Sequence, residues 1–233
     1  MKNIAVIPAR GGSKRLPGKN IRPFLGQPII LHSVSAAIEC KLFEKVIVSS
    51  DDPAILELAR EAGADVQKRH ANLAGDEVPI AEVCLAVLHE EPANTYDNLC
   101  CLYATAALRT CDDILKAYQQ LLVPEVDGVT AITSYGKNPL KALRLNSNDT
   151  LTPMWPEYAR LQSQDLPSLW VDNGSLHWVK VPAFLREKNF YVEKMSGYPM
   201  PRNRSIDIDT LEDFQFAEWN AHQLGLVHKG EKP

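Results

Sequence analysis

The chain has 233 residues, 45% of them hydrophobic, and carries 25 Lys and Arg against 29 Asp and Glu, a formal net charge of -4. A mildly acidic chain disfavours a general nucleic-acid binder, and no apolar run approaches the roughly 18 residues that a membrane span needs. The length fits one sizeable domain with an appendage as well as two small domains.

Strand and helix patterns alternate over the first 134 residues. A short apolar run at 3–8 is followed by a polar, glycine-rich segment, which indicates a buried strand that leads into a loop. Further strands are predicted at 44–50, 64–66, 96–103 and 128–133, and helices at 28–38, 53–62, 79–91 and 111–122. Strands that alternate with helices of this length favour βαβ units, so we expect an α/β fold with a mainly parallel sheet.

The composition and the hydrophobic pattern of the sequence change after Ser134. Residues 135–172 contain four prolines and scattered aromatic residues without a helical period, and a strand at 173–181 and a closing helix at 210–224 follow. We therefore expect three parts. These are a main α/β domain from 1–134 and 206–227, an inserted arm at 135–205 and a flexible tail at 228–233.

The five cysteines form an odd set without a C-x-x-C pair. We expect these cysteines to be reduced and buried, which indicates a cytoplasmic protein and argues against a zinc site. The N-terminus reaches Pro8 and Arg10 too early for the apolar core of a signal peptide.

A basic loop follows the first predicted strand. It holds three glycines and five cations with no acid between 10 and 22, namely Arg10, Lys14, Arg15, Lys19 and Arg22. Glycines let backbone N–H groups approach an anion, and the cations neutralise it. Five residues separate Gly12 from Gly18, one more than a Walker A loop allows, and Asn20 stands where that motif has Ser or Thr. We predict a polyphosphate site of another kind.

An acidic pair lies about 190 residues later. Asp207 and Asp209 are two positions apart, so in a strand they would project to one face. Two carboxylates on one face repel unless a cation lies between them, and oxygen ligands suit Mg²⁺ bound to substrate phosphates. The alternative is that Asp209 or Thr210 caps the following helix. Together with the basic loop, the pair indicates a Mg²⁺-dependent nucleotidyltransferase.

Several segments resemble the sugar-activating cytidylyltransferases, the enzymes that make CMP-sialic acids and related sugars. They are PARGGSKRLPGKN at 8–20, RHANLA at 69–74 and DIDT at 207–210. Segments similar to the pseudaminic acid branch of that family are CCLYAT at 100–105, PEY at 156–158, SQDL at 163–166 and RSIDIDT at 204–210. Three positions depart from that branch: Asn173 is closer to the sialate and legionaminate enzymes, Ile80 replaces a small hydroxyl residue, and a proline is missing at 106–108.

The resemblance implies a Rossmann-like, three-layer fold of the nucleotide-diphospho-sugar transferase type with a dimerisation arm, and hence a homodimer. It implies attack by the anomeric 2-hydroxyl of a nine-carbon 2-keto sugar acid on the α-phosphorus of CTP. Mg²⁺ would be the cofactor, with no nucleic acid or membrane as a partner. Arg10, Lys19 and Asp209 would be catalytic, and Asp207 and Asp209 would hold the metal.

The resemblance also implies binding residues. Those for the nucleotide would be Ala9, Arg10, Gly11, Gly12, Ser13, Lys14, Asn20 and Arg69. Candidates for the sugar acid are Tyr103, Thr105, Lys141, Arg160, Ser163, Gln164 and Asp165. Trp155, Trp170 and Trp178 could line the sugar pocket or pack in the arm, and the six histidines are expected on the surface or on helices. No general base is assigned.

The alternatives are a sialate or legionaminate synthetase and the cytidylyltransferase for 3-deoxy-manno-octulosonate, whose first loop also contains an R-L-P-G-K run. From other classes come a CTP-binding regulator without catalysis and a Walker-type NTPase, which the loop spacing disfavours.

Overall fold

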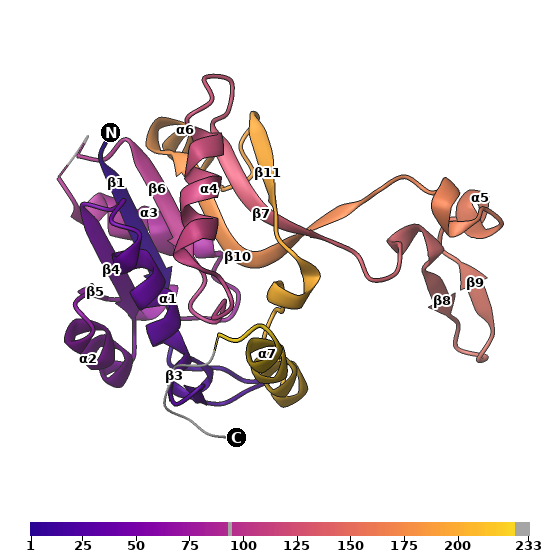
Figure 1. The fold of residues 1–233 in the computed structure, drawn as a ribbon, viewed down its shortest axis with the longest axis horizontal. Coiled ribbons are helices and arrows are strands. Elements are labelled where there is room, and N and C mark those ends of the chain that lie inside the picture. The colour runs from indigo at the N-terminus through magenta and orange to yellow at the C-terminus, as the bar shows by residue number, and fades with distance from the viewer. Residues whose placement is uncertain (93–94, 227–233) are drawn as a thin grey trace.

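A seven-stranded sheet forms the centre of the protein, seen here in a computed structural model that describes residues 1–92 and 95–226 (Figure 1). The strand order is β11-β7-β10-β6-β1-β4-β5. The bounds are β1 (Asn3–Pro8), β4 (Lys45–Ser50), β5 (Asp65–Lys68), β6 (Asn98–Leu102), β7 (Gly128–Ser134), β10 (Trp170–Lys180) and β11 (Met195–Pro199). β10 is antiparallel to β6 and β7, and the other pairs are parallel, so the sheet is mainly parallel as predicted.

Helices cover both faces of the sheet and give three layers. One face packs against α1 (Ile29–Glu39), α2 (Pro53–Glu61) and α4 (Cys111–Leu121). The other packs against α3 (Ile80–Glu90) and α6 (Val181–Glu187). Because the parallel strands are buried on both faces, they consist of nearly continuous apolar residues, which is why their positions could be predicted.

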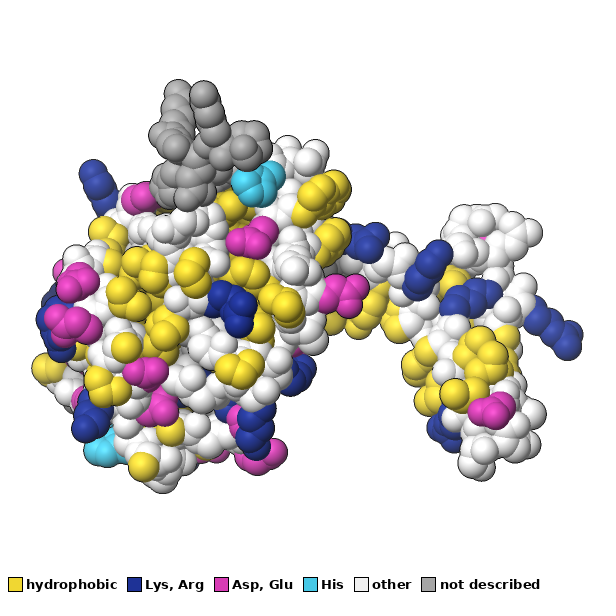
Figure 2. All heavy atoms as spheres, turned by 90° about the horizontal axis from the view of Figure 1, so that it is seen from below, with side chains coloured by type: hydrophobic (Ala, Val, Ile, Leu, Met, Phe, Trp, Pro, Cys, Tyr) yellow, Lys and Arg dark blue, Asp and Glu magenta, His cyan; other side chains and the backbone are white. Residues whose placement is uncertain are grey.

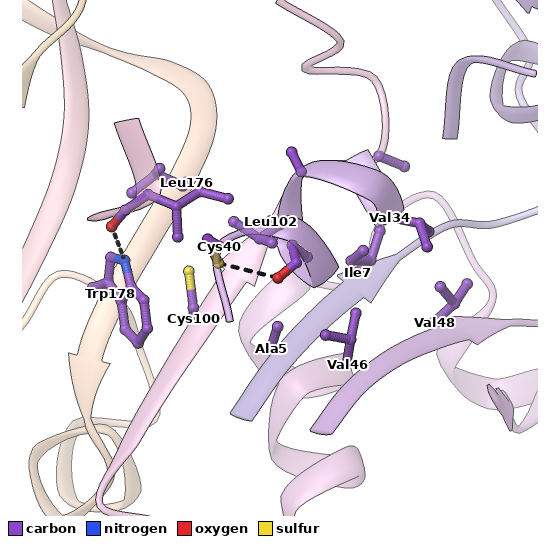
Figure 3. Close-up of a cluster of buried hydrophobic side chains, with 14 of the residues drawn as sticks. Ala5, Ile7, Val34, Cys40, Val46, Val48, Cys100, Leu102, Leu176 and Trp178 are labelled. Carbon is purple, nitrogen blue, oxygen red and sulfur yellow. Dashed lines mark hydrogen bonds between the residues drawn. The ribbon is translucent and has the colours of Figure 1, made fainter. Parts of the chain in front are cut away.

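The larger core cluster lies between the sheet and α1, α2 and α4 (Figure 3). Trp178 is fully buried there, and its indole Nε1 donates to the carbonyl of Ile114 at 3.2 Å. It therefore neither lines a sugar pocket nor lies in the arm. Four of the five free cysteines are buried and the fifth is partly buried, as expected, and burial raises the pKa values of Cys100 and Cys101, which keeps these thiols protonated.

A separate arm projects from the sheet between β7 and β10 (Figure 1). It contains a two-stranded hairpin and one short helix: β8 (Leu143–Leu145), β9 (Leu151–Pro153) and α5 (Pro156–Ala159). The predicted arm of 135–205 was too long, because β10 and β11 both belong to the central sheet and only residues 135–169 project. The predicted tail at 228–233 lies outside the described residues.

The last helix, α7 (Leu211–Gln223), packs against the small antiparallel pair β2 (Pro23–Phe24) and β3 (Gln27–Pro28). The contact includes an edge-to-face pair of Phe24 and Phe214 with ring centroids 5.5 Å apart. This third apolar cluster also buries Leu16 and Ile208. It therefore brings the basic loop after β1 and the acidic segment before α7 together, although they are far apart in sequence.

Within the described ranges, no helix is long and apolar enough to cross a membrane.

Candidate active site

The predicted nucleotide and metal residues gather at one edge of the sheet. The carboxyl ends of β1, β4 and β6 lie side by side there, since Pro8 pairs with Ser49 and Val6 with Cys101. β10 runs the opposite way, so its amino end reaches the same edge. Ligands of open α/β sheets bind outside the carboxyl ends of the strands, and this edge fits that rule.

Backbone contacts fix the basic loop. The N–H of Ala9 donates to the carbonyl of Ser49 at 3.0 Å, and the N–H of Gly11 donates to Asp51 Oδ1 at 2.9 Å. The side-chain amide of Asn20 donates to the carbonyl of Arg10 at 2.8 Å. Ala9 and Asn20 are thus buried parts of the loop's scaffold, while Gly12 and Ser13 lie near its surface.

The cations of the loop pair with two aspartates. Arg10 and Lys14 both contact the carboxylate of Asp76, which lies between β5 and α3. Sequence reasoning missed Asp76, because a single acid in a polar loop carries no signal. Its contact shows that the side chains of Arg10 and Lys14 converge on one oxyanion, as they would on a phosphate.

Asp209 is the second partner of the loop. Its carboxylate lies 2.7 Å from Arg15 Nη1 and 3.2 Å from Lys19 Nζ, and Lys19 also donates to the carbonyl of Ile208. The two predicted halves of the site therefore meet directly, across 190 residues of sequence.

Arg69 has a different place from the other cations. It is buried, and its Nη2 donates to the carbonyl of Ser49 at 2.7 Å, while its Nε has no partner. Burial lowers the pKa of its guanidinium, and the nearby charge of Asp51 opposes that shift. Arg69 braces the end of β4 beside the loop, so its predicted contact with the nucleotide stays a prediction.

The acidic pair lies in an extended segment between the turn Arg202–Arg204 and α7, not in a strand. Removal from solvent raises the pKa of Asp207, and the negative charge of Asp209 raises it further. Thr210 caps α7 through a reciprocal pair of hydrogen bonds with Asp213, so the cap does not use Asp207 or Asp209. The cap thus leaves both carboxylates available, with Asp209 paired to Arg15 and Lys19, and the repulsion that raises the pKa of Asp207 fits a cation held between the two aspartates.

The pair alone cannot complete a metal site. Across residues 1–92 and 95–226, no group of three or more His, Cys, Asp or Glu side chains could hold an ion. Mg²⁺ commonly takes one or two carboxylates and fills its other positions with water and substrate phosphates, so two aspartates are a sufficient protein contribution.

The predicted sugar residues fall into two groups. Tyr103 and Thr105 lie in the turn after β6, at the site. The other five lie in the arm, away from the acidic pair of the same chain (Figure 1): Lys141, Arg160, Ser163, Gln164 and Asp165. Lys141 Nζ donates to the carbonyls of Ala159 and Leu161 and so holds the arm together. Within one chain the structure does not bring these five residues to the site.

Three residues at the site were not predicted: Asp172, His177 and Tyr191. They form a cluster beside Tyr103. The histidine was expected on the surface or a helix but lies buried in β10, where burial lowers its pKa. Only the turn signal of Asp172 could have marked this cluster in the sequence, because its members meet through tertiary packing.

The packing of Gly11 leads to a prediction for binding of the expected nucleotide. A Cβ at Gly11 would lie 2.7 Å from Cβ of Asp52, whereas a Cβ at Gly12 would meet nothing within 4 Å. Asp52 is held as the N-cap of α2, so the loop must move instead. We expect Gly11→Ala to raise the KM for the nucleotide substrate by about 10-fold or more, since small displacements of positioning groups are costly. Steady-state kinetics with Gly12→Ala as the matched control test this, and equal effects of both changes would contradict it.

A basic loop whose cations converge on carboxylates, next to the acidic pair Asp207 and Asp209, defines a nucleotidyltransferase-type site on a nucleotide-binding fold. A family model described as Cytidylyltransferase matches residues 4–231, and the chain belongs to this family. It is an enzyme of the nucleotidyltransferase class.

Curated relatives agree with this assignment. The chain is 35% identical over 222 residues to a pseudaminic acid cytidylyltransferase of Campylobacter jejuni, covering 94% of this chain and 95% of that protein. It is 30% identical to a CMP-N,N'-diacetyllegionaminic acid synthase of Legionella pneumophila, with 94% and 95% covered. It is 32% identical to an N-acylneuraminate cytidylyltransferase of Streptococcus agalactiae, with 92% and 52% covered.

A solved structure shows the same fold. CMP:2-keto-3-deoxy-manno-octonic acid synthetase, complexed with CTP, superposes with a TM-score of 0.69 at 16% identity, covering 96% of this chain and 100% of that one. The predicted α/β fold of the nucleotide-diphospho-sugar transferase type is confirmed.

Proposed function

We propose that this enzyme transfers CMP from CTP to a nine-carbon 2-keto sugar acid, with pseudaminic acid as the substrate, and releases pyrophosphate. The observation that carries the choice of sugar is the 35% identity to a pseudaminic acid cytidylyltransferase across nearly the full length of both chains. The basic loop and the acidic pair supply the groups that such a transfer needs.

The reaction joins the anomeric 2-hydroxyl oxygen to the α-phosphorus and breaks the bond from that phosphorus to the bridging oxygen. The protein's part is positioning and charge neutralisation. Arg10 can hold two phosphate oxygens through its planar guanidinium, and Lys19 acts as a point charge. In the structure these two cations contact Asp76 and Asp209, so the phosphates must replace those contacts.

Asp207 and Asp209 would hold Mg²⁺. When bound, the ion would polarise the α-phosphate and lower the pKa of the sugar hydroxyl. Arg15 and Lys19 neutralise part of the charge of Asp209 in the free protein and are released as the phosphates enter. We assign no general base, because a hydroxyl activated in this way does not need a dedicated one.

A panel of sugar acids tests the proposal. Pyrophosphate release is measured with CTP and Mg²⁺ on pseudaminate, sialate, legionaminate and 3-deoxy-manno-octulosonate, and pseudaminate should give the highest kcat/KM. A higher value for one of the other three would reassign the substrate, and no release with any of them would overturn the function.

We also propose a cytoplasmic homodimer joined through the arm. The arm exposes large apolar side chains (Figure 2), which alone in water would be a liability. They are Leu143, Leu145, Leu151, Met154 and Leu161, all at least 40% exposed. The free cysteines support the cytoplasm. In such a dimer, the arm's Lys141 and Arg160 could serve the second copy's site.

Light scattering tests the dimer. We expect a mass about twice the 25.9 kDa of one chain, and we expect Leu145→Asp to shift it toward one chain because the new charge would be buried at the contact. Leu185→Asp, at a position 42% exposed on α6, is the matched control and should leave the mass unchanged. A wild-type mass of one chain would contradict the proposal.

A further inference from the structure

A small pocket lies next to the acidic pair. It has a volume of about 270 Å³, and its walls include Pro79, Ile80, Tyr103, Asp172, His177 and Tyr191. A tight turn separates it from the acids: the N–H of Gly174 donates to Asp172 Oδ1 at 2.9 Å, and a Cβ at Gly174 would lie 3.8 Å from the carboxyl carbon of Asp207. A substrate held at the acidic pair can therefore extend into this pocket.

The proton positions in the pocket follow from the partners of His177. This side chain is buried, stacks on Phe190 with centroids 4.8 Å apart, and is neutral because burial lowers its pKa. Its Nε2 lies 3.3 Å from Asp172 Oδ2, and its Nδ1 lies 3.0 Å from Thr130 Oγ1. An ionised carboxylate only accepts, so Nε2 carries the proton, and the hydroxyl of Thr130 donates to Nδ1. This tautomer presents an N–H to Asp172.

Most of the acceptor capacity of Asp172 is in use. Oδ1 accepts the N–H of Gly174, and Oδ2 accepts the hydroxyl of Tyr191 at 2.8 Å and faces Nε2 of His177. A carboxylate offers about four lone-pair positions, so one position stays open toward the pocket.

The hydroxyl of Tyr103 supplies a donor to the same space. Burial raises its pKa, so it keeps its proton, and its oxygen lies 3.5 Å from Nε2 of His177. Since Nε2 already carries a proton, the Tyr103 proton is directed to a ligand instead. The pocket thus offers an acceptor on Asp172 and a donor on Tyr103 beside the apolar wall of Pro79 and Ile80, and Glu82, Lys188 and Asn189 complete its polar lining. A secondary amide with a small alkyl group matches this set, whereas Asp172 repels a carboxylate.

We infer that Asp172 determines sugar specificity by accepting the N–H of an acylamino substituent, with Tyr103 donating to its carbonyl and with His177 and Tyr191 as positioning residues. The inference rests on the proposed function and specifies how that site reads its sugar. The alkyl end of the substituent packs against Pro79 and Ile80.

Asp172→Ala is the decisive change. Tyr191 and His177 occupy Oδ2, and the N–H of Gly174 takes one position of Oδ1, so the open acceptor lies on Oδ1, where asparagine would keep it and alanine removes it. We expect kcat/KM for an acylamino nonulosonate to fall by about 30-fold, because its N–H then meets no acceptor in a buried site. The analogue with a hydroxyl in place of the acylamino group should lose less than about threefold, because a hydroxyl can accept from Tyr103 and turn its own proton elsewhere.

The assay measures pyrophosphate release from the full chain with CTP and each sugar acid, or the inhibition constant where the analogue is not turned over. The KM for CTP should not change. Glu193→Gln, which alters an exposed acid outside the pocket lining, is the matched control and should behave as wild type with both sugars. Tyr191→Phe should raise the KM for the acylamino sugar and leave its kcat unchanged.

The outcomes are distinguishable. Equal losses for both sugars, with an unchanged melting temperature, would overturn the specificity role of Asp172 and leave the proposed function standing. No turnover of any nonulosonate by the wild-type enzyme would overturn the proposed function, and this inference with it. A selective loss for the acylamino sugar supports both.

Discussion

Asp209→Asn should reduce turnover by about 1,000-fold while the protein stays folded, because it removes a charged ligand from the proposed metal site. The change keeps the size of the side chain, and the cap of α7 by Thr210 and Asp213 does not depend on it. Pyrophosphate release with saturating CTP and Mg²⁺ measures the effect, and circular dichroism checks the fold.

The matched control is Glu212→Gln. Glu212 is an exposed acid in the first turn of the same helix, so the change removes the same charge close by without touching the acidic pair. It should leave turnover within about twofold of wild type, as surface changes away from the chemistry usually do. Full activity of Asp209→Asn, or wild-type activity without Mg²⁺, would eliminate the metal role.

The largest effect on stability is expected at Asp113, which is 1% exposed. It accepts from Arg204 through both guanidinium Nη atoms, from the hydroxyl of Tyr198 at 3.0 Å and from the backbone N–H of Thr110, with which it forms the capping box of α4. Asp113→Ala leaves Arg204 without its counter-charge and removes the capping box of α4. We expect the free energy of unfolding to fall by about 3–5 kcal/mol, measured by urea denaturation.

Asp112→Ala is the matched control. Asp112 is the neighbouring residue, its side chain is 65% exposed, and it pairs with Lys116 on the helix surface. Such a pair contributes about 0.5 kcal/mol. A similar loss for both variants would contradict the role assigned to Asp113.

The effect of Asp113 should depend on pH. Burial raises the pKa of this carboxyl, but its hydrogen bonds from Arg204 and Thr110 outweigh burial, and the net shift is downward. The unfolded chain therefore binds the proton first as pH falls. The stabilisation is fully present above the unfolded pKa of about 3.9 and is lost as pH falls through the lower folded pKa. The difference between wild type and Asp113→Ala should narrow below about pH 4 for this reason.

Strands and helices could be predicted from the sequence where a local hydrophobic pattern alone determines them. The apolar runs of β1, β4, β6 and β7 and the helical periods of α1–α4 and α7 were predicted because burial on a fixed face leaves a period in the sequence. Thr210 was named as a possible cap of the last helix because a short side chain with an acceptor oxygen suits that position, and it does cap α7. The cluster of five cations at 10–22 and the pair Asp207 and Asp209 were likewise visible as patterns.

Features that depend on tertiary contacts were missed. β11 and α6 are short, and β11 became a strand only by pairing with β7 at the sheet's edge, so the arm was predicted too long. The acidic pair was considered as part of a strand, in which both carboxylates would share a face, but the segment pairs with no strand of the described sheet and links the turn Arg202–Arg204 to α7. The contact of Asp76 with Arg10 and the cluster around His177 join residues far apart, which spacing alone cannot reveal.

The antiparallel strand β10 has a mechanical consequence. The arm leaves the sheet after Ser134 and re-enters at Trp170, and these two residues are paired in the sheet. Asp172 follows only two positions later, opposite Ile132. In the proposed dimer, the backbone that joins the arm to the sheet therefore also carries a wall of the proposed sugar pocket. We expect a shortened arm to reduce the discrimination between sugar acids before it weakens CTP binding.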